Sequence, residues 1–380
     1  MTRKTASDCN ERVLINEYYF KALLSAIGDA KESIDLETYI FSEDQFGLAV
    51  TTALIKAVER NVRVRLLVDG VGSHRWSDRI TQKLINSGVL VHIYHPIPWK
   101  KGRLVDIFKV WRIFASILRL GSRNHRKCCI IDNKSVFISS SNIERWHIVK
   151  KDIKIPFRNT SIYITNVAPK DLKQLQYAFD KAWGQIPVKK RWHFYTERID
   201  VDPVFRLNYF TRLRYKLYQS QLERMKRCRK RIWITNAYFL ANYLLLYELT
   251  QAAKNGIDVR IILPCKYELP PFAFVTETFY SILFNAGVSI YEYSPRILHA
   301  KSLILDDWYS VGSSNLNFRS FIHDLEVDAH VTTLEAMATL EKQYLIDIAH
   351  SKKITAKHIK DIALYKRIIG HFFLLFKYWL

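Results

Sequence analysis

One pattern in this chain combines residues that could do chemistry: H-x-K-x4-D, a histidine and a lysine two positions apart with an aspartate five positions further on. It occurs twice, as His125, Lys127, Asp132 and as His299, Lys301, Asp306. Downstream of each copy the sequence places a Ser-x-Asn turn, formed by Ser140, Asn142 and by Ser313, Asn315. The duplication indicates two half-sites that combine into one site.

These residue types suit attack on a phosphodiester. A neutral imidazole is a competent nucleophile near pH 7. Two lysines neutralise the non-bridging phosphate oxygens, and the Asn amides and the Ser140 and Ser313 hydroxyls add phosphate-binding donors. A second, protonated histidine gives its proton to the departing alkoxide. This chemistry requires no metal and no other cofactor, and the residues alone leave open which histidine attacks.

The spacing within each motif predicts different roles for the lysine and the aspartate. In a strand, residues two apart share a face, so the histidine and lysine of one motif should project together. The aspartates follow an apolar run and fall on the opposite face. We therefore expect Asp132 and Asp306 to be structural anchors.

The elements that position these motifs are also repeated. Residues 85–96 (INSGVLVHIYHP) match residues 284–295 (FNAGVSIYEYSP), and ESIDLETYIF (32–41) matches RIWITNAYFL (231–240). Apolar, β-branched segments alternate with amphipathic ones, which predicts an α/β fold of two pseudo-symmetric lobes, each a mixed sheet flanked by helices, with the active site at the lobe interface. The expected division is a first lobe at 1–185, a connector at 186–206, a second lobe at 207–350 and a tail at 351–380.

The net charge of +22 predicts an anionic partner, whether nucleic acid, a membrane surface or a phosphate-bearing substrate. Five scattered cysteines without a C-x-x-C pair argue against a disulfide framework or a zinc site and favour a reducing, cytoplasmic compartment. No apolar run is long enough to span a bilayer as one plain helix.

The paired motifs and their contexts resemble the phospholipase D superfamily, whose sites are built from two HKD motifs. The stretches LETYIFSED (36–44), HRKCCIID (125–132) and HAKSLILDDWYSVGSSNL (299–316) are most similar to bacterial cardiolipin synthases that lack N-terminal transmembrane helices. The resemblance implies a phosphohistidine intermediate, with His125 as nucleophile and His299 as proton donor. It also implies transfer of a phosphatidyl group to an alcohol.

Two departures from the family pattern concern the first motif. Ser139 stands where the family usually has glycine. Family members also orient each catalytic histidine with a downstream carboxylate, a role that Glu326 fits for the second motif. For the first motif the matching position is Asn159, whose amide should stabilise a neighbouring imidazolium less well than a carboxylate would. On this reading Asn159 lowers the basicity of His125.

Two segments carry basic and aromatic residues suited to an anionic lipid surface. The first lobe has an insertion near 97–121, directly before His125, and the chain ends in the tail at 351–380. The membrane contacts expected from them are Trp99, Phe108, Trp111, Phe114, Phe372, Phe373 and Trp379. Burial against the protein is the alternative for both segments.

The leading interpretation is a peripheral enzyme of the cytoplasmic membrane, acting as a monomer on phospholipid substrates and making cardiolipin or a close relative. Three alternatives stay open: a phospholipase D hydrolase that releases phosphatidic acid, an HKD-type nuclease, and an inactive membrane-binding homologue. The aromatic segments favour lipid over nucleic acid as the partner.

Overall fold

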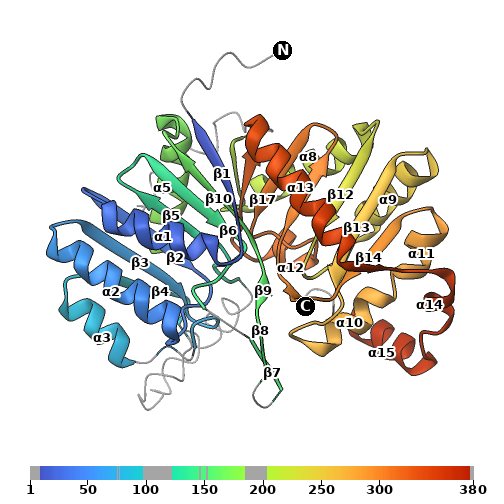
Figure 1. Ribbon diagram of the computed structural model, residues 1–380, viewed down its shortest axis with the longest axis horizontal. Helices are drawn as coiled ribbons and strands as arrows, with labels where there is room; N and C mark the ends of the chain where they lie inside the picture. Colours follow the sequence, from blue (N-terminus) through green and yellow to red (C-terminus); the bar gives the residue numbers. More distant parts are fainter. Residues whose placement is uncertain are drawn as a thin grey trace.

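The computed structural model describes residues 9–74, 76, 78–96, 122–144, 147–150, 153–184 and 203–376, which form two α/β lobes side by side (Figure 1). The expected insertion at 97–121 and most of the connector lie outside these residues. The same holds for five of the expected membrane contacts: Trp99, Phe108, Trp111, Phe114 and Trp379.

The first lobe is built on a mixed sheet with the strand order β1-β10-β6-β5-β2-β3-β4. Strands β2, β3 and β4 are parallel neighbours, and β5 joins β2 antiparallel. The strands are β1 (Asn10–Ile15), β2 (Ser33–Thr38), β3 (Arg63–Asp69), β4 (Leu90–Tyr94), β5 (Cys128–Ile131), β6 (Ser135–Ser139) and β10 (Thr160–Thr165). The helices are α1 (Tyr18–Asp29), α2 (Gln45–Glu59), α3 (Asp78–Asn86) and α5 (Pro169–Trp183).

The second lobe repeats this plan with the order β11-β18-β17-β16-β12-β13-β14-β19. Its strands are β11 (Phe205–Leu207), β12 (Arg231–Thr235), β13 (Asp258–Pro264), β14 (Ser289–Tyr293), β16 (Ser302–Leu305), β17 (Trp308–Gly312), β18 (Val327–Val331) and β19 (Ser351–Lys353). Its helices are α8 (Thr211–Arg227), α9 (Tyr243–Lys254), α10 (Pro270–Glu277), α11 (Tyr280–Asn285), α12 (Phe318–Ile322), α13 (Leu334–Ala349), α14 (Ala356–Lys360) and α15 (Leu364–Leu374). The expected fold class, two mixed sheets flanked by helices, is confirmed.

The repeated sequence stretches form matching elements for the same physical reasons. Every residue of β2 is buried, as expected for a strand covered on both faces. The helix after β2 begins at Asp44, whose carboxylate accepts hydrogen bonds from the first-turn amides of α2. Asn242 does the same for α9, the helix after β12. Both caps satisfy amides that have no partner inside the helix.

The two lobes share one hydrophobic core. Ile162 and Ile164 of β10 belong to the same buried cluster as Val311 of β17 and Val331 of β18. Two short strands, β9 (Phe157–Arg158) and β15 (Ile297–Leu298), pair in parallel across the lobe boundary, and Figure 1 shows β9 between the two lobes. Both apolar packing and backbone pairing therefore hold the lobes together.

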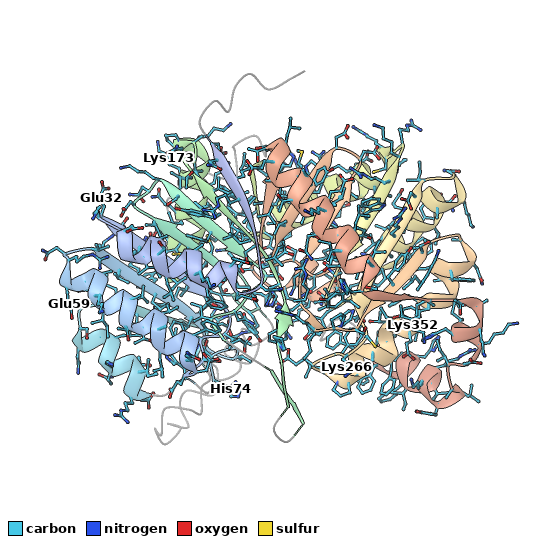
Figure 2. All side chains as sticks on the ribbon, in the orientation of Figure 1. Glu32, Glu59, His74, Lys173, Lys266 and Lys352 are labelled. Atoms are coloured by element: carbon cyan, nitrogen blue, oxygen red, sulfur yellow. The ribbon has the colours of Figure 1, made fainter. Side chains whose placement is uncertain are left out.

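A buried ion pair crosses the same boundary. The guanidinium of Arg158, on β9, donates two hydrogen bonds to Asp347 of α13, with Nε–Oδ1 and Nη2–Oδ2 distances of 3.0 and 2.6 Å. The two side chains are only 3% and 2% exposed. Most other charged side chains, such as Glu59 and Lys352, lie on the outside of the lobes (Figure 2).

The chain end differs from the expected separate tail. Strand β19 pairs with the edge strand β14, and α15 packs against α10 closely enough that a Cβ at Gly370 would lie 2.4 Å from the carbonyl oxygen of Phe274. Residues 351–376 therefore belong to the second lobe. Phe373 packs against its core, whereas Phe372 is 56% exposed. In the part of the chain that the structure describes, no helix is long and apolar enough to cross a membrane.

The Arg158–Asp347 pair generates a stability prediction. The Asp347→Ala variant leaves a guanidinium buried without its counter-ion, so we expect the free energy of unfolding to fall by about 3–5 kcal/mol. Urea denaturation measures the change. Glu223→Gln, which breaks an ion pair between side chains that are 55% and 81% exposed, is the control and should cost about 1 kcal/mol or less. Equal effects of the two variants would contradict the account.

Candidate active site

Two short backbone contacts across the lobe boundary position the two motif histidines. The amide of His125 donates to the carbonyl of Leu325 at 2.9 Å, which places this histidine beside Glu326. The amide of His299 donates to the carbonyl of Arg158, also at 2.9 Å, which places it beside Asn159. The two contacts are equivalent under the repeat, so each lobe supplies one histidine and holds the other lobe's.

The side chains follow this crossed arrangement. His125 Nδ1 lies 2.9 and 3.0 Å from the two carboxylate oxygens of Glu326. His299 Nδ1 lies 3.1 Å from Asn159 Oδ1. The expectation that each residue orients the histidine of its own lobe was wrong, because the chain segments that meet at the boundary come from opposite lobes. Asn159 therefore orients His299, and the partner of His125 is a carboxylate.

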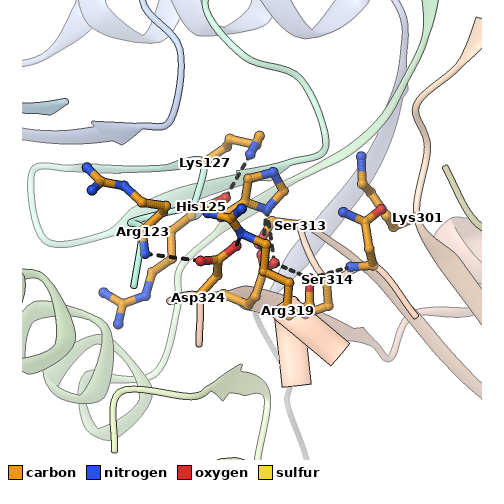
Figure 3. Close-up of polar contacts among 12 residues, drawn as sticks. Arg123, His125, Lys127, Lys301, Ser313, Ser314, Arg319 and Asp324 are labelled. Carbon is orange, nitrogen blue, oxygen red and sulfur yellow. Dashed lines mark hydrogen bonds and ion pairs between the residues drawn. The ribbon is translucent and has the colours of Figure 1, made fainter. Parts of the chain in front are cut away.

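The two motif lysines lie in the same buried site (Figure 3). Lys127 Nζ donates to the carbonyl of His125 at 2.7 Å, and Lys301 Nζ donates to the carbonyl of His299 at 2.6 Å. The histidines and lysines precede strands β5 and β16 and are not part of them. The assumption that each pair lies within a strand was therefore wrong, although the histidine and lysine of each motif do lie in the same site.

Burial makes the electrostatics of this site unusual. It lowers the pKa of His125 well below its usual value, and the charges of Lys127 and Lys301 lower it further. Burial also lowers the pKa of Lys127 to about 8, although Glu326 opposes the shift. The pKa of Lys301 falls because of burial and the charge of Lys127. A bound phosphate diester would compensate the charges of the two lysines, and the lowered pKa keeps the His125 imidazole neutral.

Glu326 is the buried carboxylate at the centre of these contacts. It is 2% exposed, and burial raises its pKa to about 7, although Lys127 and hydrogen bonds from Ser313 and Ser320 oppose the shift. Ser320 Oγ donates to Oε1 at 2.7 Å. These hydroxyls hold the carboxyl group in place against His125 Nδ1.

The motif aspartates are structural anchors, as predicted. Asp132 accepts three backbone amide hydrogen bonds from residues 31–33, and Asp306 accepts three from residues 229–231. Burial raises the pKa of each, but the backbone hydrogen bonds outweigh it and lower the pKa overall. Each aspartate thus ties the hairpin after a motif strand to the start of a parallel strand.

The structure gives Ser140 and Ser313 a role other than the expected phosphate binding. Ser140 Oγ donates to Asn159 Oδ1 and accepts from the amide of Thr160, both at 3.0 Å. Ser313 Oγ makes the equivalent contacts to Glu326 and the amide of Val327. Both serines are fully buried. Their hydroxyls therefore position the residues that orient the histidines.

Ser139 is accommodated in place of glycine because its neighbour is small. In the second lobe a Cβ at Gly312 would lie 2.1 Å from Oδ1 of Asp328, which leaves no room for a side chain. The equivalent neighbour of Ser139 is Ser161, and the two hydroxyls are 2.7 Å apart. Ser139 Oγ also accepts the Ser141 amide, as Asp328 accepts the Ser314 amide.

The motif asparagines lie in the turns after β6 and β17, and both are buried. Asn142 Nδ2 donates to Glu144 Oε1 at 2.8 Å. The amide oxygen of Asn315 is buried without a hydrogen-bond partner among the described residues. Within the same residues, no group of three or more His, Cys, Asp or Glu side chains is arranged to hold a metal ion.

Three further side chains line the site without having been singled out from the sequence. The Tyr39 ring meets His125 edge-on at 5.1 Å between centroids, and the Tyr238 ring meets His299 edge-on at 6.3 Å. Arg319 adds a positive charge that lowers the pKa of His125. The two tyrosines occupy the same position in the repeated stretches at 32–41 and 231–240, so the repeat held a signal that could have identified them.

Comparisons with known proteins agree with this architecture. Residues 23–183 and 222–347 match the family described as cardiolipin synthase, PLD-like domain. Cardiolipin synthase B of Salmonella typhimurium is 30% identical over 319 residues, which cover 82% of this chain and 73% of the relative. Cardiolipin synthase of Halalkalibacterium halodurans is 29% identical over 361 residues, covering 92% of this chain and 68% of the relative.

Solved structures share the fold. The phosphatidylserine synthase of Haemophilus influenzae aligns with a TM-score of 0.67 at 14% identity, over 97% of this chain and 95% of that one. The polyphosphate kinase of Porphyromonas gingivalis aligns with a TM-score of 0.62 at 12% identity, over 97% of this chain and 53% of that one. On the match to the family and the 30% identical relative, this chain belongs to the cardiolipin synthase family of phospholipase D-like proteins.

Proposed function

We propose that this phospholipase D-type phosphatidyltransferase joins two phospholipids into cardiolipin through a phosphohistidine on His125. The observation that carries the proposal is the crossed pairing of the histidines. Each imidazole is held through Nδ1 by a residue of the opposite lobe, so Nε2 is the nitrogen that serves the phosphorus chemistry.

In the first step the Nε2 lone pair of His125 attacks the phosphorus of the donor lipid, forming a P–N bond. The P–O bond to the donor headgroup breaks, and the departing alkoxide takes a proton from His299. Lys127 and Lys301 neutralise the non-bridging oxygens. The imidazole of the intermediate is cationic, and the carboxylate of Glu326 at Nδ1 stabilises that charge better than the amide of Asn159 would.

In the second step the roles reverse. His299, now neutral, accepts the proton of the acceptor hydroxyl, and the acceptor oxygen forms the new P–O bond as the P–N bond breaks. The phosphatidyl group leaves His125, and both histidines return to their initial protonation states. Water in place of the alcohol would give phosphatidic acid, so the identity of the acceptor separates the transferase from a hydrolase.

A lipid assay tests the proposal. The protein is incubated with labelled phosphatidylglycerol and phosphatidylethanolamine, and products are identified by mass spectrometry. We expect cardiolipin, and we expect His125→Ala to lower turnover by at least about 10³-fold because the covalent step is lost. Phosphatidic acid alone would indicate the hydrolase. Cleavage of DNA or RNA without lipid turnover would indicate the nuclease.

The Asn159→Asp variant tests the crossed pairing. A carboxylate beside His299 should raise the pKa of that imidazole by roughly 1–3, so the acidic limb of the pH profile for the transfer step should move to higher pH. Because a larger fraction of His299 is then protonated for the first step, we expect overall transferase activity near neutral pH to be retained or raised in the variant. Asn255→Asp, an exposed site that adds the same charge, is the control and should leave the pH profile unchanged. A collapse of activity in Asn159→Asp, or an unmoved pH profile, would contradict the assignment.

The outer face of α15 supports a membrane contact. Leu364, Ile368, Phe372 and Leu375 are 72%, 60%, 56% and 75% exposed, at spacings that place them on one side of the helix. Such a contiguous exposed apolar face, bordered by the basic side chain of Arg367, is typical of a helix that lies in a lipid interface. This face supports the proposal that the protein acts as a peripheral membrane enzyme, for which we propose the cytoplasmic face.

Replacing two of these residues tests the contact while leaving the packing of α15 on α10 intact. The double variant Ile368→Asp, Phe372→Asp should lower binding to phosphatidylglycerol liposomes at least about tenfold. The reason is that two apolar side chains, which would be buried in the lipid on binding, are replaced by charged ones. Co-sedimentation measures it. Leu334→Asp, at another exposed apolar site that is 84% exposed, is the control. Unchanged liposome binding in the double variant would defeat the prediction.

A further inference from the structure

The surroundings of the two histidines differ in charge, although the lobes share a plan. Tyr39 and Tyr238 are equivalent in the repeat, and each ring lies edge-on to one histidine. On the His125 side, the carboxylate of Glu326 contacts the imidazole, and the charges of Asp69 and Arg319 act on Tyr39. On the His299 side, the imidazole contacts the amide of Asn159, and the carboxylates lie around Tyr238 instead.

Glu268 is the first of these carboxylates. The Tyr238 hydroxyl donates to Glu268 Oε2 at 3.2 Å, and the negative charge of Glu268 acts on Lys301. Glu268 lies in the loop after β13, is half-buried, and precedes α10. The equivalent residue in the first lobe is Ser73, whose hydroxyl binds the backbone carbonyl of Tyr39. The carboxylate is therefore specific to the His299 side.

Glu144 is the second carboxylate on this side. It follows the first motif's turn, is half-buried, and accepts the hydrogen bond from Asn142. Its charge acts on both Tyr238 and Lys127, so it lies close to residues of both halves of the site. We call Glu268 and Glu144 together the acidic wall of the site. Glu144 comes from the first lobe and Glu268 from the second, so both lobes contribute to it.

The reaction geometry determines which part of the substrate meets that wall. In an in-line displacement the leaving oxygen lies opposite the attacking nitrogen. With His125 attacking, the departing headgroup and then the incoming alcohol both lie beside His299, and therefore beside Tyr238 and Glu268. This step rests on the proposed function and its assignment of the two histidines.

We propose that Glu268, Glu144 and Tyr238 form the headgroup subsite of the enzyme, and that it selects alcohols carrying a second hydrogen-bond donor. The two sources of that chemistry are the neighbouring hydroxyl of a glycerol headgroup and the ammonium of an ethanolamine headgroup. Carboxylates accept hydrogen bonds from either group but repel a second anion placed against them. A plain alkyl alcohol leaves the carboxylates without a new partner.

Binding measurements test the subsite without requiring turnover. The probes are phosphoethanolamine, glycerol 3-phosphate and propyl phosphate, which share a phosphate and differ in the second donor. Calorimetry should show the first two binding at least about tenfold more tightly than propyl phosphate, the value of one charge-assisted hydrogen bond. In Glu268→Gln the preference for phosphoethanolamine should fall to about threefold or less. Glu335→Gln, an exposed site on α13, is the control and should keep the preference.

A competition assay extends the test to the reaction. Transfer to ethanolamine, glycerol and propan-1-ol is measured in one mixture, and Glu268→Gln should lose its preference for the first two over propan-1-ol. Tyr238→Phe, which keeps the ring but removes the hydrogen bond to Glu268, should show a smaller loss in the same direction.

The outcomes separate this subsite from the proposed function. An unchanged ratio in Glu268→Gln overturns the subsite, and so does equal weakening of all three probes, which would indicate a structural role. No preference among the probes in the unaltered protein, or no binding of any of them, also overturns it. Probe selectivity without any lipid turnover would sustain the subsite and reject the transferase, whereas cardiolipin synthesis without selectivity would do the reverse.

Discussion

The site depends on backbone pairing across the lobe boundary. Each histidine donates its own amide to a carbonyl of the opposite lobe, in the residue directly before the one that orients it. Since a backbone hydrogen bond fixes position within a few tenths of an ångström, His125 and Glu326 cannot separate unless the lobes do. The shared hydrophobic core and the Arg158–Asp347 pair keep the lobes docked. The geometry of the site and the stability of the interface therefore depend on the same contacts.

This arrangement buries two positive charges close together, which is unfavourable. Lys127 and Lys301 are 1% and 3% exposed, and the charge of Lys127 acts on Lys301. Burial destabilises their charged forms, and Glu326 offsets only part of the effect. A bound anion would compensate both lysines, which explains why this site suits a phosphodiester.

The lobes have diverged where their chemistry differs. Glu326 and Asn159 occupy equivalent positions and receive equivalent hydrogen bonds from Ser313 and Ser140. One is a carboxylate and the other an amide. In the proposed mechanism His125 becomes a cationic phosphohistidine, which a carboxylate at Nδ1 stabilises. His299 both gives and takes a proton in that mechanism, and an amide partner leaves it freer to release one. The difference between the lobes thus fits the two roles proposed for the histidines.

Short-range features of the site were readable from the sequence. The duplicated motifs identified the histidines and lysines, the strand periodicity identified Asp132 and Asp306 as anchors, and the repeat predicted two mixed sheets, because spacing along a chain governs local geometry. The tertiary structure alone decided the partners of the histidines and placed the chain end on the second lobe. His125 and Glu326 are 201 positions apart and His299 and Asn159 are 140 apart, and contacts at that range depend on how two lobes dock. The pattern of apolar and polar residues within either lobe does not specify how the two lobes dock.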